Sequence, residues 1–306
     1  FLPPAERRLY VVGGKGGVGK STAAAALATW RAARGGGRVL LLSVDPAGSL
    51  AEVLAQPVGI SPTAVEGAPG LDAQQLDAEA VWSEFRGRYR TEAETLFESL
   101  VSGGPGAGSD REVVERLIDL APPGIDELMA VMEVIDLLDA REYDALVIDT
   151  APTGHFLRLL QLPALALEWT HALLRLLLKY REVTGLGALA ERTLGLARDL
   201  RALRALLGDP ARTWFLAVAL PEALSVPETG RLLARLPELG LRPGALLVNR
   251  ALSPGGTLLE GGTERVAELV RLAGALPSAA APALDPAPAG AAALLDFARS
   301  WKRIST

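Results

Sequence analysis

The 306-residue sequence has no cysteine and only two histidines. Without thiols the chain forms no disulfide, zinc–thiolate site or iron–sulfur cluster, and it has no thiolate with which to capture a soft metalloid. An excess of positive charge is also absent, because 31 basic and 36 acidic side chains give a net charge of −5. We therefore expect no global attraction to nucleic acid or to anionic lipid.

A long uninterrupted apolar run is missing as well. The most apolar stretch, residues 156–178, is interrupted by the polar and charged side chains Arg158, Gln161, Glu168, His171 and Arg175. Charges at this density are costly in the core of a bilayer, which a helix crosses with about 20 apolar residues. The sequence predicts no transmembrane segment.

Glycine, in contrast, is concentrated in residues 13–22. The phosphate-binding pattern G-x-x-x-x-G-K-[ST] is met there by Gly14, Gly19, Lys20 and Ser21. A strand is predicted before this loop, at 9–12, and a helix after it, at 23–34. The glycines allow the backbone to turn its N–H groups toward a polyphosphate, and the helix adds its positive N-terminal end.

The side chains of the loop have separate predicted roles. Lys20 reaches the β- and γ-phosphates of the nucleotide, and the Ser21 hydroxyl is a ligand of Mg²⁺. Lys15 is one lysine more than the pattern needs. A cation this early in the loop cannot easily curl back onto its own nucleotide, so it favours a nucleotide shared between two subunits. The predicted nucleotide-binding residues of the loop are Gly14, Lys15, Gly16, Gly17, Val18, Gly19, Lys20, Ser21 and Thr22.

Further apolar runs recur between helical stretches. Strands are predicted at 9–12, 38–44, 145–148, 214–219 and 245–248. Near-continuous apolar strands that alternate with helices indicate an α/β fold, with a mostly parallel central sheet covered by helices on both faces. We expect one phosphate-loop NTPase domain over 1–306, in which the helical tracts 74–142 and 155–208 form an inserted helical subdomain. An extended loop is predicted at 277–290. An amphipathic helix with three basic residues, which either covers the sheet or touches a membrane, is predicted at 291–304.

A carboxylate follows the second predicted strand. Asp45 lies at the end of a parallel strand, where ligands bind in open α/β sheets. It is predicted to position or activate the water that attacks the γ-phosphate, so Asp45, Lys15 and Lys20 are the catalytic candidates. The structural alternative is a turn residue ahead of Pro46.

Two further strands also end in polar residues. Asp149 closes the third strand and is predicted to hold Mg²⁺ together with Ser21 and Asp45. Asn249 closes the strand at 245–248, and its amide offers both a donor and an acceptor to the edge of a base. A cap at the end of the strand is the alternative role for Asn249. The guanine-reading tetrapeptide Asn-Lys-x-Asp is absent, which favours adenine and therefore ATP.

Together these motifs resemble the arsenite-pump ATPase family, which also contains the targeting ATPase for tail-anchored membrane proteins. The similarity extends through 13–22, 41–47, 122–127, 143–155, 157–163, 221–229 and 248–250. The resemblance implies that Lys15 is the signature lysine of a nucleotide-sandwich dimer. It also implies that Asp45 and 149–155 are two switches, and that Asn249 and the loop before residue 291 cradle adenine.

The sequence departs from the family pattern in two respects. Gly48 stands where relatives usually have a histidine. Relatives that expel arsenite use cysteines, and eukaryotic targeting members join their dimer through a zinc-binding cysteine pair, so neither property carries over to this chain.

The predicted function is a Mg²⁺-dependent ATPase that works as a homodimer, or as a heterodimer with a related chain. We expect it in the cytoplasm, with peripheral attachment to a membrane left open. Apolar stripes at 81–100 and 162–183 either pack on each other or form a nucleotide-controlled groove for an apolar client helix. One alternative is the catalytic subunit of an anion or metalloid efflux pump, docked on a membrane protein. Another is a positioning ATPase of the partition or division type, against which the long helical tracts argue.

Overall fold

The computed structural model describes residues 1–3, 6–35, 37–44, 50–75, 142–150, 167–168, 170–171, 174–175 and 186–305. The chain divides into two compact units. Unit 1 comprises Phe1–Leu76, Ile135–Leu157 and Leu206–Thr306, and unit 2 comprises Asp77–Val134 and Arg158–Ala205. Most residues of the helical tracts at 74–142 and 155–208, with their apolar stripes, lie outside the described ranges. The helical subdomain and its proposed groove therefore stay predictions.

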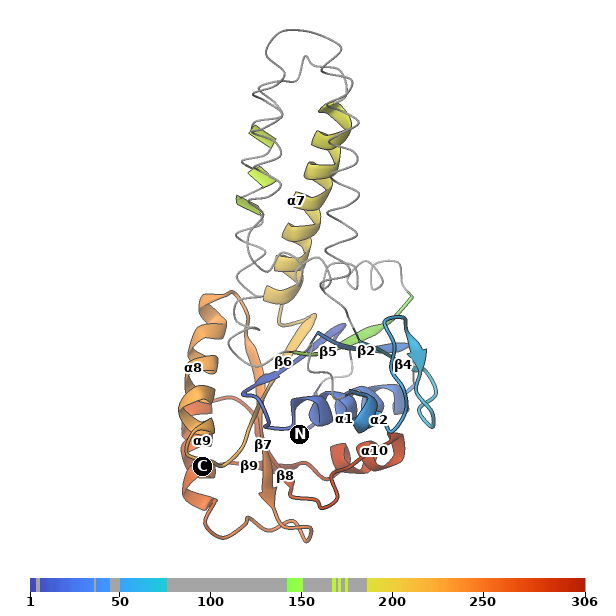
Figure 1. The fold of residues 1–306 in the computed structure, drawn as a ribbon. Coiled ribbons are helices and arrows are strands. Elements are labelled where there is room, and N and C mark those ends of the chain that lie inside the picture. The colour runs from blue at the N-terminus through green and yellow to red at the C-terminus, as the bar shows by residue number, and fades with distance from the viewer. Residues whose placement is uncertain are drawn as a thin grey trace. The chain divides into compact units, whose positions relative to one another are not determined.

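The described part of unit 1 is built on one nine-stranded sheet, shown in Figure 1. Its strands are β1 (Leu9–Gly14), β2 (Val39–Ser43), β3 (Thr63–Ala64), β4 (Leu71–Gln75), β5 (Ala145–Asp149), β6 (Thr213–Ala219), β7 (Pro243–Leu252), β8 (Ser278–Pro282) and β9 (Lys302–Ile304). Their order across the sheet is β3-β4-β2-β5-β1-β6-β7-β8-β9. Only β3 and β9 are antiparallel to their neighbours. The predicted α/β class with a mostly parallel sheet is confirmed.

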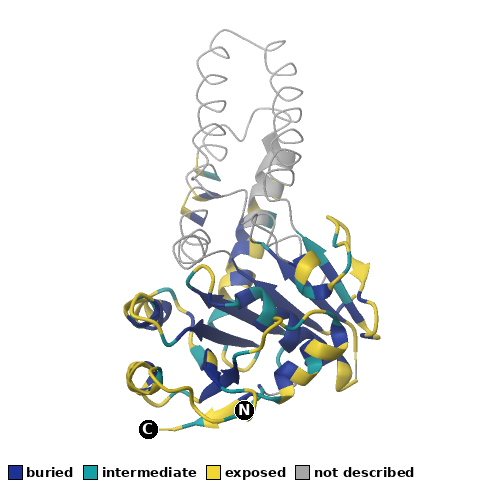
Figure 2. Cartoon of the chain, turned by 60° about the horizontal axis from the view of Figure 1, so that its bottom comes forward, coloured by how far each residue is buried: buried dark blue, intermediate teal, exposed yellow. Residues whose placement is uncertain are grey.

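Six helices lie within the described residues. They are α1 (Lys20–Ala33), α2 (Leu50–Leu54), α7 (Leu186–Gly208), α8 (Ser225–Glu238), α9 (Thr263–Ala273) and α10 (Ala291–Arg299). Most of α7 belongs to unit 2. The apolar side chains of α1, α2 and α10 form one buried cluster with every second residue of the central strands. The intervening strand residues point to the opposite face. On the sheet, α8 contacts β1, β6 and β7, and α9 contacts β7. The central strands are buried along their whole length, as Figure 2 shows.

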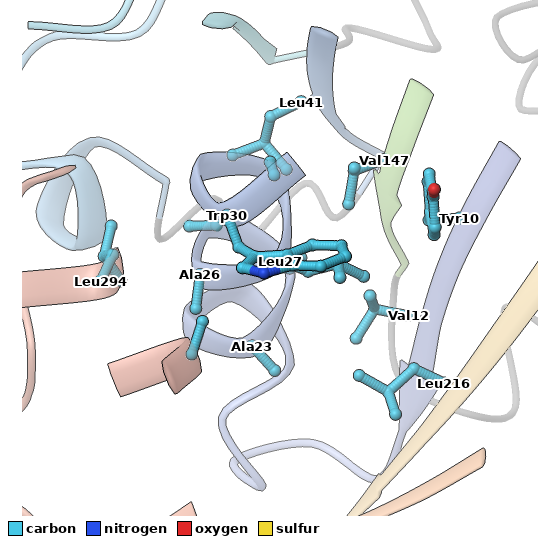
Figure 3. Packing of buried hydrophobic residues seen from close by; sticks show 14 of the residues in the cluster. Tyr10, Val12, Ala23, Ala26, Leu27, Trp30, Leu41, Val147, Leu216 and Leu294 are labelled. Carbon is cyan, nitrogen blue, oxygen red and sulfur yellow. The ribbon is translucent and has the colours of Figure 1, made fainter. Parts of the chain in front are cut away.

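Helix α1 is buried on almost all sides. Six consecutive small or apolar residues, from Ala23 to Ala28, are at most 1% exposed, and Trp30 is 7% exposed. Figure 3 shows the helix between strand residues such as Val12 and Val147 and Leu294 of α10. A helix that is apolar all round is typical of a protein core. The start of α1, and with it the preceding loop, is therefore held in place by the core.

Four strands were not predicted from the sequence: β3, β4, β8 and β9. The segment 277–290, predicted as an extended loop, contains β8 at Ser278–Pro282. The predicted helix at 291–304 is too long, because α10 ends at Arg299 and Lys302–Ile304 pairs with β8 as strand β9. Ser300 is the C-cap of α10, and Trp301, which follows it, is buried and packs edge-on against Phe297 with ring centroids 6.0 Å apart.

The apolar face of α10 is used inside unit 1. Its buried residues are Ala291, Leu294, Phe297 and Ala298, and the helix packs on α1. The C-terminal helix was predicted either to cover the sheet or to touch a membrane; in the structure α10 packs on α1, and α1 in turn contacts β1, β2, β4 and β5. Among the described residues, no helix combines the length and the apolar character that crossing a bilayer requires.

Candidate functional site

The glycine-rich loop joins β1 to α1 in the middle of the sheet, where β1 lies between β5 and β6. Gly14, the last residue of β1, pairs with Val218 of β6. A Cβ atom on Gly14 would lie 2.2 Å from the carbonyl oxygen of Val218, so only glycine fits this close approach. The loop therefore leaves the sheet directly between two parallel strands, at their carboxyl ends, where ligands bind in such folds.

Lys20 is the first residue of α1 and is only 5% exposed. Its Nζ donates a hydrogen bond to the carbonyl oxygen of Lys15 over 3.3 Å, so the ammonium group lies inside the loop. Gly19 precedes the helix in the left-handed conformation, with φ at 89°, and the first turn has no acidic residue. The positive end of the helix and the Lys20 ammonium thus point to the same place, which suits an anion.

The remaining loop residues differ in exposure. Gly16 and Gly17 are exposed, Lys15, Ser21 and Thr22 are half-buried, and Val18 is buried in the core cluster. The loop is thus anchored at Val18 and open at its tip.

Asp149 ends β5 next to the loop and is completely buried. The Ser43 hydroxyl, at the end of β2, donates to Asp149 Oδ2 over 3.4 Å. Thr150 donates from its hydroxyl to the carbonyl oxygen of Val12 over 2.8 Å, which ties the end of β5 to β1. A carboxylate and a hydroxyl are the hard oxygen ligands that Mg²⁺ prefers, so Asp149 and Ser21 have the right chemistry to hold this ion beside a phosphate.

Asn249 lies in β7, two strands away from β1. Its side chain is 6% exposed. The amide Nδ2 donates to the carbonyl oxygen of Val18 over 2.9 Å, and Oδ1 accepts from the N–H of Arg250 over 2.9 Å. The structure therefore brings Asn249 against the glycine-rich loop. The predicted contact of Asn249 with adenine stays a prediction.

Most of the predicted site comes together at the carboxyl ends of the parallel strands, near the middle of the sheet. The loop with its two lysines, Ser21, Asp149 and Asn249 meet there from β1, α1, β5 and β7. Asp45, Gly48 and the second switch beyond residue 150 lie outside the described residues. Sequence reasoning missed Ser43 and Thr150, although each is a hydroxyl residue at the end of an apolar strand.

A glycine-rich loop that runs from a central parallel strand into a helix beginning with lysine, beside an acidic residue at the end of the neighbouring strand, defines a phosphate-loop NTPase. A sequence profile of the anion-transporting ATPase family matches residues 7–256. The chain belongs to this family, which confirms the resemblance drawn from the motifs. It is therefore an ATP-hydrolysing enzyme by class.

Individual relatives agree with this assignment. ATPase asna-1 of Caenorhabditis elegans is 33% identical over 79% of this chain and 74% of its own length. ATPase GET3B of Arabidopsis thaliana is 34% identical over 81% of this chain and 65% of its own length. A Halobacterium salinarum protein provisionally named an arsenical pump-driving ATPase is 35% identical over 77% of this chain. The chain spans only 33% of that last protein's length.

Proposed function

We propose that this protein binds ATP with Mg²⁺ on the β1–α1 loop and works as a dimer that shares its nucleotides. In this cycle, binding and hydrolysis open and close a helical surface that receives an apolar client or a protein partner. The observation that carries the proposal is the position of Lys20. Its ammonium group is buried within the loop and contacts the Lys15 carbonyl oxygen at the positive end of α1.

The geometry supports binding of the phosphates as follows. A buried ammonium beside a helix N-terminus attracts an anion strongly, because little water screens the charges there. The tripolyphosphate of ATP would replace the Lys15 carbonyl oxygen as the acceptor for Lys20. The Ser21 hydroxyl and the Asp149 carboxylate would hold Mg²⁺, which neutralises charge that develops on the phosphates during hydrolysis.

Lys15 supports the dimeric part of the proposal. The Lys15 side chain is half-buried, whereas Lys20 is almost completely buried. The backbone carbonyl oxygen of Lys15 accepts the hydrogen bond from Lys20. The two lysines of one loop therefore differ in environment. Lys20 serves the nucleotide of its own subunit, and Lys15 serves the nucleotide of the second subunit. A cation supplied in this way can act as an arginine finger does in other NTPases.

The client is proposed on the helical tracts, where the apolar residues of 162–183 cover a wider arc than one buried face needs. The chain has no thiol that could bind a metalloid. The proposal therefore does not extend to arsenite.

Substitution of Lys20 by alanine tests the nucleotide site. We expect Lys20→Ala to weaken ATP binding by about 100-fold or more and to abolish Mg²⁺-dependent phosphate release, since one buried charge contact with phosphate is lost. Isothermal titration calorimetry and a phosphate-release assay measure the two effects. Lys302→Ala is the matched control, because Lys302 also donates from Nζ to a backbone carbonyl oxygen, that of Gly256, over 3.1 Å. Normal ATP affinity and turnover in Lys20→Ala would overturn the assignment.

A further inference from the structure

We propose that Asn249 is a positioning residue for phosphate binding, because its side-chain amide fixes the shape of the glycine-rich loop. This role is separate from any contact between Asn249 and the base. It rests on the proposed nucleotide site and specifies how that site is kept in shape. The carrying observation is the hydrogen bond from Asn249 Nδ2 to the Val18 carbonyl oxygen over 2.9 Å.

The orientation of the Asn249 amide follows from its two partners. The Val18 carbonyl oxygen only accepts hydrogen bonds, so the amide nitrogen must face it. The backbone N–H of Arg250 only donates, so Oδ1 must face that group. A flipped amide would lose both bonds. The side chain therefore has a single orientation in which both bonds form, with its nitrogen directed at the loop.

The backbone of β7 is shaped to deliver this side chain. The pairing of β7 with β8 shifts register between Val248 and Leu252, on either side of Asn249. Arg250 adopts a left-handed conformation, with φ at 53°, which is uncommon for a residue with a side chain. Bulges and strained residues next to a functional site commonly re-aim a side chain. In β7 the register shift and the left-handed Arg250 direct the Asn249 side chain toward the glycine-rich loop.

The loop is shaped to receive it. Gly19 has φ at 89°, and a Cβ atom there would lie 2.4 Å from Asn249 Nδ2, so a larger residue at position 19 would displace the amide. Val18 has its side chain in the core and its carbonyl oxygen on Asn249. The exposed tip at Gly16 and Gly17 is therefore followed by a residue that is fixed at two points. Such pre-organisation lowers the entropy that the loop loses when it closes on phosphate.

The same amide can serve the base as well. An amide nitrogen carries two hydrogens, and only one is directed at Val18. A contact between the second hydrogen and a base would leave the loop contact intact. Asn249 would then link the base end of the nucleotide to the loop that holds its phosphates.

A ligand that has phosphates but no base separates the two roles. The probes are Mg²⁺-ATP and Mg²⁺-tripolyphosphate, and the affinity of each is measured by calorimetry for the wild-type protein and for Asn249→Ala. We expect both affinities to fall by about tenfold, as for the loss of one buried hydrogen bond. The KM for ATP should rise accordingly, with a smaller change in kcat. A loss confined to ATP, or no loss at all, overturns the proposal.

Gln56→Ala is the matched control. The Gln56 amide also donates to a backbone carbonyl oxygen, that of Ala64, and accepts from a backbone N–H, that of Glu66. It lies by β3, at the far edge of the sheet from β7. An equal loss of tripolyphosphate affinity in Gln56→Ala would show general destabilisation and would contradict a specific role for Asn249.

A second measurement needs no ligand. Amide hydrogen exchange at Gly19 and Lys20 should be faster in Asn249→Ala than in the wild-type protein, and unchanged in Gln56→Ala. Asn249→Asp keeps the size of the side chain and the acceptor for Arg250 but has no donor for Val18, so it should show the same increase. Unchanged exchange in both Asn249 variants would also overturn the proposal. A wild-type protein that binds neither probe would instead contradict the proposed nucleotide site.

Discussion

Small hydroxyl residues hold the ends of three neighbouring strands in register beside the glycine-rich loop. Ser43 ends β2 and contacts the Asp149 carboxylate, and Thr150 joins the end of β5 to Val12 of β1. All of these polar groups are buried, so their hydrogen bonds are made at low dielectric and keep a narrow geometry. In the proposed metal-binding role, the Asp149 carboxylate would therefore need little reorganisation when Mg²⁺ and nucleotide bind.

Asp45 lies shortly after Ser43 in the sequence, and we predict that it contributes to the chemistry of hydrolysis. Asp45→Asn should lower kcat for ATP hydrolysis by about 100-fold, the contribution of one general base, and leave ATP affinity close to the wild-type value. Single-turnover kinetics and calorimetry measure the two quantities separately. Asp296→Asn, which alters an exposed aspartate, serves as the control. An equal loss of kcat and of affinity in Asp45→Asn would point to a structural role for this carboxylate.

At the scale of elements, side chains join three adjacent strands, β4, β2 and β5, near their amino ends, at the opposite end of the strands from the glycine-rich loop. Arg38 precedes β2, Asp72 lies in β4 and Tyr143 precedes β5. The Arg38 guanidinium and the Tyr143 hydroxyl both donate to Asp72 Oδ2, over 2.6 and 2.9 Å. The guanidinium also lies 4.6 Å from the centroid of the Tyr143 ring. The three side chains form a clamp on β2, β4 and β5, which we call the edge clamp.

The edge clamp predicts how stability depends on pH. Burial, and then the hydrogen bond to Asp72 and the charge of that residue, raise the pKa of Tyr143 to about 12. The folded state therefore binds the phenol proton more tightly than the unfolded state does, in which the pKa is about 10. The contribution of protonated Tyr143 to the free energy of unfolding is therefore complete below about pH 10, and it is lost as the pH rises toward 12.

Urea unfolding of Tyr143→Phe tests this expectation. Below pH 9 the variant should be less stable than the wild-type protein by about 1 kcal/mol, because the hydrogen bond to Asp72 is lost. Between pH 10 and 12 the wild-type protein should lose on the order of 1 kcal/mol more than the variant, a figure reduced for solvent screening. Parallel loss of stability in the two proteins over that range would contradict the assignment.

The elements that could be predicted from the sequence are those with a clear local pattern, either a continuous apolar run or a complete motif. Strands such as β1 and β6 are continuous apolar runs, and the loop after β1 has a complete motif. β4 was missed because Leu71–Gln75 is largely polar. β8 was missed because Ser278–Pro282 consists of a serine, three alanines and a proline, which have little preference for strands. Its place in the sheet comes from pairing with β7 and β9, which a local pattern does not reveal.

The candidate site shows the same division. Gly14, Gly19, Lys20 and Asp149 were assigned from motifs, and the structure places them together. The contact of Asn249 with Val18 joins residues that are far apart in the sequence, and it depends on an irregular strand. A local sequence pattern therefore could not predict it.

At the scale of the whole molecule, the proposed dimer can be tested by complementation. Lys15→Ala and Lys20→Ala subunits should each be nearly inactive alone. A mixture should regain part of the wild-type turnover, because in a mixed dimer one site has Lys20 from one subunit and Lys15 from the other. The specific activity of the wild-type protein should also rise with its concentration. The ATPase assay measures both effects.

Two outcomes would contradict shared nucleotides. One is a mixture that is no more active than its separate components. The other is turnover independent of protein concentration, from a species that sediments as a monomer with a transition-state analogue bound.

The packing of α1 against α10 has a consequence for the making of the protein. The ribosome makes α1 long before it makes α10 and Trp301, which pack on α1 and on Phe1. Translation proceeds at roughly 5–20 residues per second, so α1 waits on the order of tens of seconds for these neighbours. During this time the nascent chain carries an apolar helix without its final cover, and the helix that bears Lys20 is among the last parts of unit 1 to be finished.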